Sequence, residues 1–77
     1  MANYIIEFRR QNEPIVGAEV TASGERIYGI TDSNGQISVD INYNAPIAVH
    51  FHVKAENFQS GSGPHRLEPN ETTVIRL

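Results

Sequence analysis

The sequence predicts an all-β protein, a small β-sandwich of about seven short strands. Isoleucine and valine together number fifteen among the 77 residues, against two leucines, and β-branched side chains suit a pleated sheet better than a helix. Several segments alternate strictly between apolar and polar residues, and none has the apolar period of an amphipathic helix. Turn-forming residues recur roughly every 8–12 positions, which is typical of sandwiches. Residues 1–77 are therefore expected to form a single domain.

The first part of the chain divides into three strands separated by turns. Residues 4–9 alternate between large apolar and mostly polar side chains and predict the first strand. Residues 11–14 contain asparagine and proline, which favour a turn. A second strand over 18–22, a turn over 23–25 and a third strand over 27–31 are expected to follow.

The dipeptide Asn34-Gly35 predicts a tight hairpin between two alternating runs. Asn-Gly is the preferred pair for a type I′ turn, in which both central residues have positive φ. With these two residues as the loop, Thr31 pairs with Ser38 across the hairpin. One face of the hairpin is then expected in the core, namely Tyr28, Ile30, Ile37, Val39 and Ile41.

Segment 47–55 is the longest predicted strand and alternates with a period of two. The residues expected to face the core are Ile47, Val49, Phe51, Val53 and Ala55. Those expected to face away are Ala48, His50, His52 and Lys54. Before this strand a turn is expected over 42–46, and after it a loop over 56–66, in which Phe58 covers one end of the core. Residues 72–77 predict the last strand.

Four segments in order resemble the carboxypeptidase regulatory-like domains. They are EPIVGAEV at 13–20, TDSNGQISV at 31–39, AVHFHVKAENF at 48–58 and the closing stretch at 67–77. Asn12 and Asn57 stand where that family usually has glycine. The resemblance implies a prealbumin-like Greek-key sandwich, shared with transthyretin-like and Cna B-type domains. It also implies a role as a spacer, stalk unit or adaptor beside other domains.

Two chemistries found in relatives of that fold are not expected here. Transthyretin-related hydrolases of a urate product end in Tyr-Arg-Gly-Ser, whereas this chain ends in Val-Ile-Arg-Leu. Cna B-type pilin domains form a Lys–Asn isopeptide bond, whereas the single lysine, Lys54, is predicted on a polar face and the last strand has no asparagine. We therefore expect no enzymatic activity and no cofactor.

His50 and His52 form the most informative pair of polar residues. Side chains two apart on a strand point the same way, so both imidazoles can reach one metal ion, which needs at least a third ligand. If Ile41 pairs with Ile47, Asp40 lies diagonal to His50 and supplies that ligand, and His65 is a more distant candidate. Two alternatives to a metal site are open. The face is only solvated, or His50, His52 and Lys54 contact a protein, with Arg9 extending the basic strip.

Composition and charge exclude several classes of function. The absence of cysteine removes disulfides and thiolate chemistry. Nine acidic residues against six basic ones, with a net charge of -3, argue against binding nucleic acid or an anionic membrane. No apolar stretch approaches the roughly 20 residues of a membrane span, and no signal peptide is evident. The chain is thus expected to be cytosolic as written, or a fragment of an exported protein.

Two classes of function stay open. The first is a structural or protein-binding module, an adaptor or spacer in a larger assembly such as a secretion spike, a phage appendage or a surface protein. The second is a small-ligand binder, which would hold a metal through the His50/His52 face or a glycan through loops. Tyr43 and Tyr4 are the candidate exposed aromatic residues for a glycan. The sequence does not indicate an oligomeric state.

Overall fold

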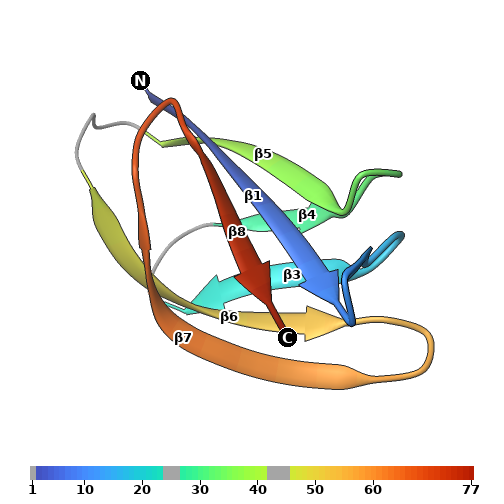
Figure 1. The fold of residues 1–77 in the computed structure, drawn as a ribbon. Coiled ribbons are helices and arrows are strands. Elements are labelled where there is room, and N and C mark those ends of the chain that lie inside the picture. Colours follow the sequence, from blue (N-terminus) through green and yellow to red (C-terminus); the bar gives the residue numbers. More distant parts are fainter. Residues whose placement is uncertain (1, 24–26, 42–45) are drawn as a thin grey trace.

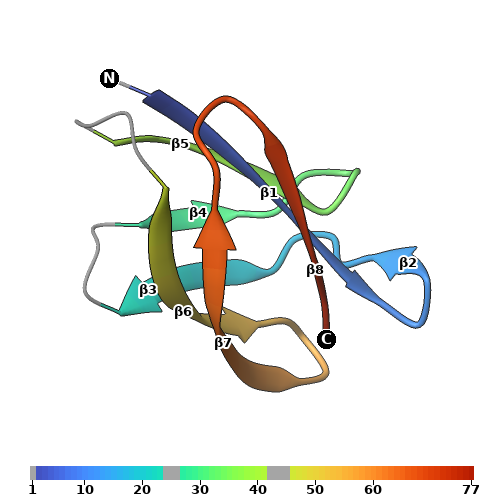
Figure 2. The same ribbon diagram turned by 60° about the vertical axis from the view of Figure 1, so that its left-hand side comes forward.

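The protein is a β-sandwich of two packed sheets, which confirms the predicted fold class (Figures 1 and 2). The computed structural model describes residues 2–23, 27–41 and 46–77. Eight strands are found in these residues, one of them only two residues long. None of the described segments forms a helix long and apolar enough to cross a membrane.

Sheet A is built around the first strand. Its members are β1 (Ala2–Arg10), β2 (Glu13–Pro14), β5 (Gln36–Ile41) and β8 (Thr72–Arg76). β2 and β5 pair antiparallel with β1, whereas β8 runs parallel to it on the other side. β2 and β5 lie one after the other along the same edge of β1. Phe8 marks the change between them, since its N–H donates to the carbonyl of Gly35 and its own carbonyl accepts from the N–H of Ile15. Sheet A is therefore at most three strands wide.

Sheet B is four strands wide and entirely antiparallel. Its order is β4-β3-β6-β7, and its members are β3 (Glu19–Ser23), β4 (Tyr28–Ile30), β6 (Ile47–Lys54) and β7 (Gln59–Leu67). The chain thus leaves sheet A after β2, returns for β5, and returns again for β8. Consecutive strands repeatedly change sheet, so that the core forms between them (Figure 2).

The core confirms the predicted first strand, β1, and the predicted faces of β6. On β1 every second side chain is fully buried, and on β6 the same alternation is seen along the whole strand. The rings of Phe8 and Phe51 meet edge to face with centroids 5.3 Å apart, an arrangement that aromatic pairs prefer. The buried members on these two strands are Ala2, Tyr4, Ile6, Phe8, Ile47, Val49, Phe51 and Val53.

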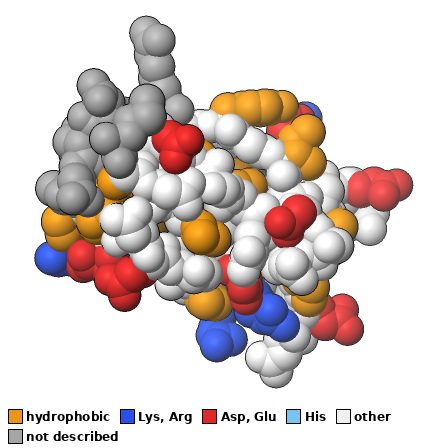
Figure 3. Space-filling view, turned by 90° about the horizontal axis from the view of Figure 1, so that it is seen from above, with side chains coloured by type: hydrophobic (Ala, Val, Ile, Leu, Met, Phe, Trp, Pro, Cys, Tyr) orange, Lys and Arg blue, Asp and Glu red, His pale blue; other side chains and the backbone are white. Residues whose placement is uncertain are grey.

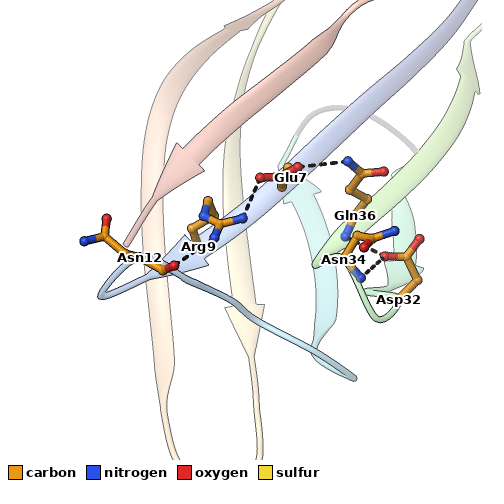
Figure 4. Close-up of polar contacts among 6 residues, drawn as sticks. All are labelled: Glu7, Arg9, Asn12, Asp32, Asn34 and Gln36. Carbon is orange, nitrogen blue, oxygen red and sulfur yellow. Dashed lines mark hydrogen bonds and ion pairs between the residues drawn. The ribbon is translucent and has the colours of Figure 1, made fainter.

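The predicted hairpin between 27–31 and 36–41 is wrong, because β4 and β5 belong to different sheets. The turn itself is present. Gly35 has a φ of 76°, and its N–H donates to the carbonyl of Asp32 at 2.9 Å. Oδ1 of Asp32 accepts the N–H groups of Asn34 and Gln36 at 2.8 and 3.0 Å (Figure 4). Asn34 does not have a positive φ, so the turn is not type I′. The chain crosses from sheet B to sheet A at this turn.

The face of β4 that points inward is also opposite to the prediction. Tyr28 and Ile30 are 61% and 59% exposed, and Gly29 between them faces the core. A Cβ atom on Gly29 would lie 3.1 Å from Cγ2 of Ile37 in sheet A. Glycine therefore leaves the space that Ile37 fills, and the two large side chains of β4 are on the surface.

The loop predicted over 56–66 is wrong, because most of it is strand β7. β7 pairs with β6 over its length, with an irregular register between Val49 and Phe51. Phe58 precedes the strand and packs half-buried against the core, as predicted. The last strand is confirmed as β8. The turns predicted over 23–25 and 42–46 have their central residues outside the described part of the chain.

Candidate functional site

The outer face of sheet B is the most distinctive surface of the described structure, and we call it the B face. It is formed by side chains that alternate with the core residues of β3, β4 and β6. They are Glu19, Thr21, Tyr28, Ile30, Ala48, His50, His52 and Lys54, all of them exposed.

The strand register places these side chains in two rows across the sheet. Tyr28 is opposite Thr21, which is opposite His52. Ile30 occupies the equivalent place in the next row, which continues through Glu19 to Lys54. Residues directly opposite have their Cβ atoms about 4.5–5.5 Å apart, so the middle residue of each row is close to both outer ones, which are two strands apart. Together the two rows place an aromatic, an aliphatic, an acidic and two basic or titratable side chains on one surface.

The side chains of the B face have few internal partners. Glu19 and Lys54 are cross-strand neighbours, yet they form no ion pair within the described structure. The side of the molecule shown in Figure 3, where no histidine is visible, has its hydrophobic side chains in small groups among polar ones. The B face is different, since it combines two large exposed hydrophobic residues with unpaired charges.

The structure does not bring the predicted metal ligands together. His50 and His52 are exposed on the B face as predicted, but Asp40 is on β5 in the other sheet. There the carboxylate of Asp40 accepts a hydrogen bond from Nδ2 of Asn3 at 3.1 Å. The pairing of β5 with β6 that placed Asp40 beside His50 is therefore wrong. Within residues 2–23, 27–41 and 46–77, no group of three or more metal-ligating side chains is found.

His65 faces the opposite side of sheet B from the other two histidines. It is paired with Val49, whose side chain is in the core, and its Nε2 lies 2.6 Å from Oγ of Ser62. A serine next to a histidine base is the beginning of a nucleophilic site, which also requires a group that orients the base. No acid in the described structure bonds to the other ring nitrogen of His65. Sequence reasoning missed this pair because β7 was not predicted.

The polar residues on the outer face of sheet A are largely paired with one another. Glu7 accepts hydrogen bonds from Nε2 of Gln36 and Nη1 of Arg9, both at 2.9 Å (Figure 4). These two hydrogen bonds, led by that from Gln36, lower the pKa of Glu7 below its ordinary value. Nη2 of Arg9 also donates to the carbonyl of Asn12 at 2.8 Å. Arg9 therefore stabilises the β1–β2 turn, and the prediction that it extends a strip with the histidines is wrong.

One cleft of about 400 Å³ lies at the end of the sandwich, between the β1–β2 turn and the β6–β7 turn. The guanidinium carbon of Arg10 is 4.4 Å from the ring centre of Phe58, a cation–π contact. Glu13 and Glu56 also line the cleft. The cleft thus has one basic and two acidic residues around an apolar wall, and its charges do not single out one class of ligand.

The aromatic residues predicted for glycan binding do not form a surface. Tyr4 is completely buried, which corrects its assignment as exposed. Tyr43 lies outside the described residues. Tyr28 is instead the exposed tyrosine of the described structure, at 61%.

Three comparisons with known proteins do not extend these observations. No protein-family description matches the chain, no curated protein matches it, and no solved structure matches it. The resemblance to carboxypeptidase regulatory-like domains therefore depends on the four sequence segments alone.

Proposed function

We propose that the chain is a non-catalytic protein-binding module whose B face contacts a partner or a neighbouring domain. The observation that supports this is the placement of Tyr28 and Ile30, each about 60% exposed, in the same two cross-strand rows as His52 and Lys54. Tyrosine is enriched at protein interfaces because it combines a large apolar area with one polar group. A rim of polar and charged residues around apolar side chains is typical of such interfaces.

The chemistry of the B face indicates what the partner presents. An apolar side chain would cover Tyr28 and Ile30, and an acidic side chain would pair with Lys54, which has no ion pair within the described structure. A module of this kind would suit an adaptor or spacer in a larger assembly, such as a secretion spike, a phage appendage or a surface protein.

Comparative affinity capture from the native cells tests this function. The parent and the double variant Tyr28→Ser/Ile30→Ser are each immobilised, and the captured proteins are quantified by mass spectrometry. Both residues are exposed, so the variant is expected to fold, and we expect it to lose the specific partner. The matched control is Thr72→Ser on the outer face of sheet A, which should retain the partner. Equal capture by all three proteins would refute a role for the B face.

A glycan is the second candidate ligand, and one observation favours it. Tyr28 is exposed beside Thr21, and His52 lies on the far side of Thr21 in the same row. This row would supply an aromatic surface and polar groups to a sugar. Binding of the parent to a glycan array, lost in Tyr28→Ser but retained in Ile30→Ser, would support the glycan and contradict the protein-binding proposal.

A further inference from the structure

We propose that the free edge of β8 accepts an extended strand from a partner protein, which would widen sheet A by one strand. Such strand addition uses main-chain hydrogen bonds for affinity and alternate side chains for specificity. This surface belongs to sheet A and is separate from the B face, so it goes beyond the function proposed above.

The backbone of β8 has unused hydrogen-bonding groups along its outer edge. In a parallel ladder every second residue of a strand bonds to its neighbour. On β8 these are the odd-numbered residues, since the N–H of Leu77 donates to β1 at 2.8 Å and the carbonyl of Glu71 accepts from β1 at 3.4 Å. The N–H and C=O groups of Thr72, Val74 and Arg76 therefore point away from β1. β8 pairs with no other strand of the described chain.

The other sheet edges have features that limit pairing. β4 is three residues long, and β7 contains Pro64 and an irregular register. β5 lies beside β4 of the opposite sheet. Short strands, prolines, bulges and neighbouring elements are the usual protection of a sheet edge. β8 has none of these: it is five residues, TTVIR, without glycine, proline or lysine, and Val74 is 45% exposed.

The inner side of the sandwich is also incompletely covered next to β8. On β7, the side chains of Ser60, Ser62 and His65 face inward, because they are paired with core residues of β6. Those core residues are at most 2% exposed, whereas the three residues of β7 are only half-buried. Sheet B is four strands wide and sheet A three, so the edge strand of sheet B lacks a full cover. A strand added to β8 would supply it.

The charges at the two ends of β8 specify the strand that fits. Arg76 is exposed and forms no ion pair in the described structure. Its charge makes the smallest contribution to the lowered pKa of Glu7, which the hydrogen bond from Gln36 lowers most. Its cross-strand neighbour Arg9 forms the ion pair with Glu7. Glu71, at the other end, is also exposed and forms no ion pair with the described residues. The fitting partner is therefore an extended segment with an acidic residue opposite Arg76, a basic residue opposite Glu71 and β-branched residues opposite the middle of β8, since β-branched residues favour strands.

A phage-displayed library of linear decapeptides, selected on the full chain, tests the proposal. We expect enrichment of alternating β-branched peptides with Asp or Glu at one end and Lys or Arg at the other. The enriched peptide is then synthesised and its affinity measured by fluorescence anisotropy. Val74→Pro removes one outward N–H and no bond to β1, and proline is tolerated at such edge positions. It should weaken binding by about tenfold or more, as expected when a partner group loses its hydrogen bond.

Two further measurements do not depend on the folding of that variant. Methylating the peptide nitrogens that face β8 should abolish binding, whereas methylating those on the other edge should not. Arg76→Glu should weaken binding about two- to fivefold, as for an exposed ion pair, and a lysine in place of the peptide's acidic residue should restore it. Ile30→Ser on the B face should bind the peptide like the parent, which separates this proposal from the first.

The proposal is overturned if no peptide is enriched, or if Val74→Pro and the methylated peptides bind as well as their parents. It is also overturned if the amides of Thr72, Val74 and Arg76 exchange slowly in the free, dilute protein. Protection of these amides that rises with protein concentration in the absence of peptide would assign the edge to a second copy of this chain instead.

Discussion

Three glycines allow the cost of backbone conformation to be separated from the cost of a close contact. Gly35 has a φ of 76°, and a Cβ atom there would lie 2.7 Å from the carbonyl oxygen of Phe8. Gly17 has a similar φ of 71° but no atom within 4 Å of the added Cβ. At Gly61 the nearest atom would be 3.9 Å away, and its φ is not in the left-handed region. Each is replaced by alanine.

Gly17→Ala should destabilise the fold by about 1–2 kcal/mol, the cost of a left-handed conformation for a residue with a Cβ atom. Gly35→Ala should cost this same conformational energy plus about 1–3 kcal/mol for the clash with the carbonyl oxygen of Phe8. That oxygen belongs to the central strand of sheet A and cannot move freely. Gly61→Ala should change stability by less than about 1 kcal/mol, in either direction. A domain of this length has roughly 4–12 kcal/mol in total, so Gly35→Ala is the variant that approaches unfolding.

The assay is urea unfolding followed by circular dichroism, with the slope of free energy against urea checked for constancy. The order of destabilisation should be Gly35→Ala, then Gly17→Ala, then Gly61→Ala. If Gly35→Ala and Gly17→Ala cost the same, the packing of the turn against β1 is not as described. A large loss in Gly61→Ala would refute the placement of β7.

Three other predictions concern the core, the stability at low pH and the B face. Phe51→Ala should cost about 3–5 kcal/mol in urea unfolding, as expected for a buried phenylalanine, and a shift of less than 1 kcal/mol would contradict its burial. Because the pKa of Glu7 is lowered in the fold, the stabilisation that Glu7 provides is present above its ordinary pKa of 4.5 and is lost as pH falls through the folded pKa. The stability difference between the parent and Glu7→Gln, measured by thermal melts, should therefore shrink as the pH is lowered below 4.5. The double variant His50→Thr/His52→Thr should retain the parent's stability within about 0.5 kcal/mol, since both side chains are exposed; zinc titration followed by NMR would contradict our account of this face if it showed a tight site in the parent that the variant lacks.

The two central strands could be predicted from the sequence because their inward residues are large and apolar. β6 shows a period of two along its whole length, and over residues 4–9 β1 departs from it only at Ile5. A shift by one residue would expose every one of the inward side chains. The exposure of His50, His52 and Lys54 followed directly from the same pattern. These parts of the fold and of the B face required no knowledge of which strands are neighbours.

The errors arise where the pattern depends on tertiary contacts. On β4 the inward position is Gly29, whose missing side chain makes room for Ile37, so the hydrophobic alternation indicated the wrong face. β7 has no alternating apolar residues because it is an edge strand, and its glycines and proline suggested a loop. Asn34-Gly35 identified a turn but not whether the flanking strands share a sheet. The position of Asp40 was derived from that pairing and was wrong for the same reason.

The crossing turn at Asp32 also affects how this protein ages chemically. Asn-Gly sequences deamidate when the backbone nitrogen of the glycine attacks the asparagine side chain and forms a cyclic imide. Here that nitrogen belongs to Gly35 and donates its hydrogen to the carbonyl of Asp32 at 2.9 Å, in a backbone held close to β1. Ring closure is therefore hindered in the folded chain and free in the unfolded one. The isoaspartate content at Asn34 should consequently record the time that a sample has spent unfolded.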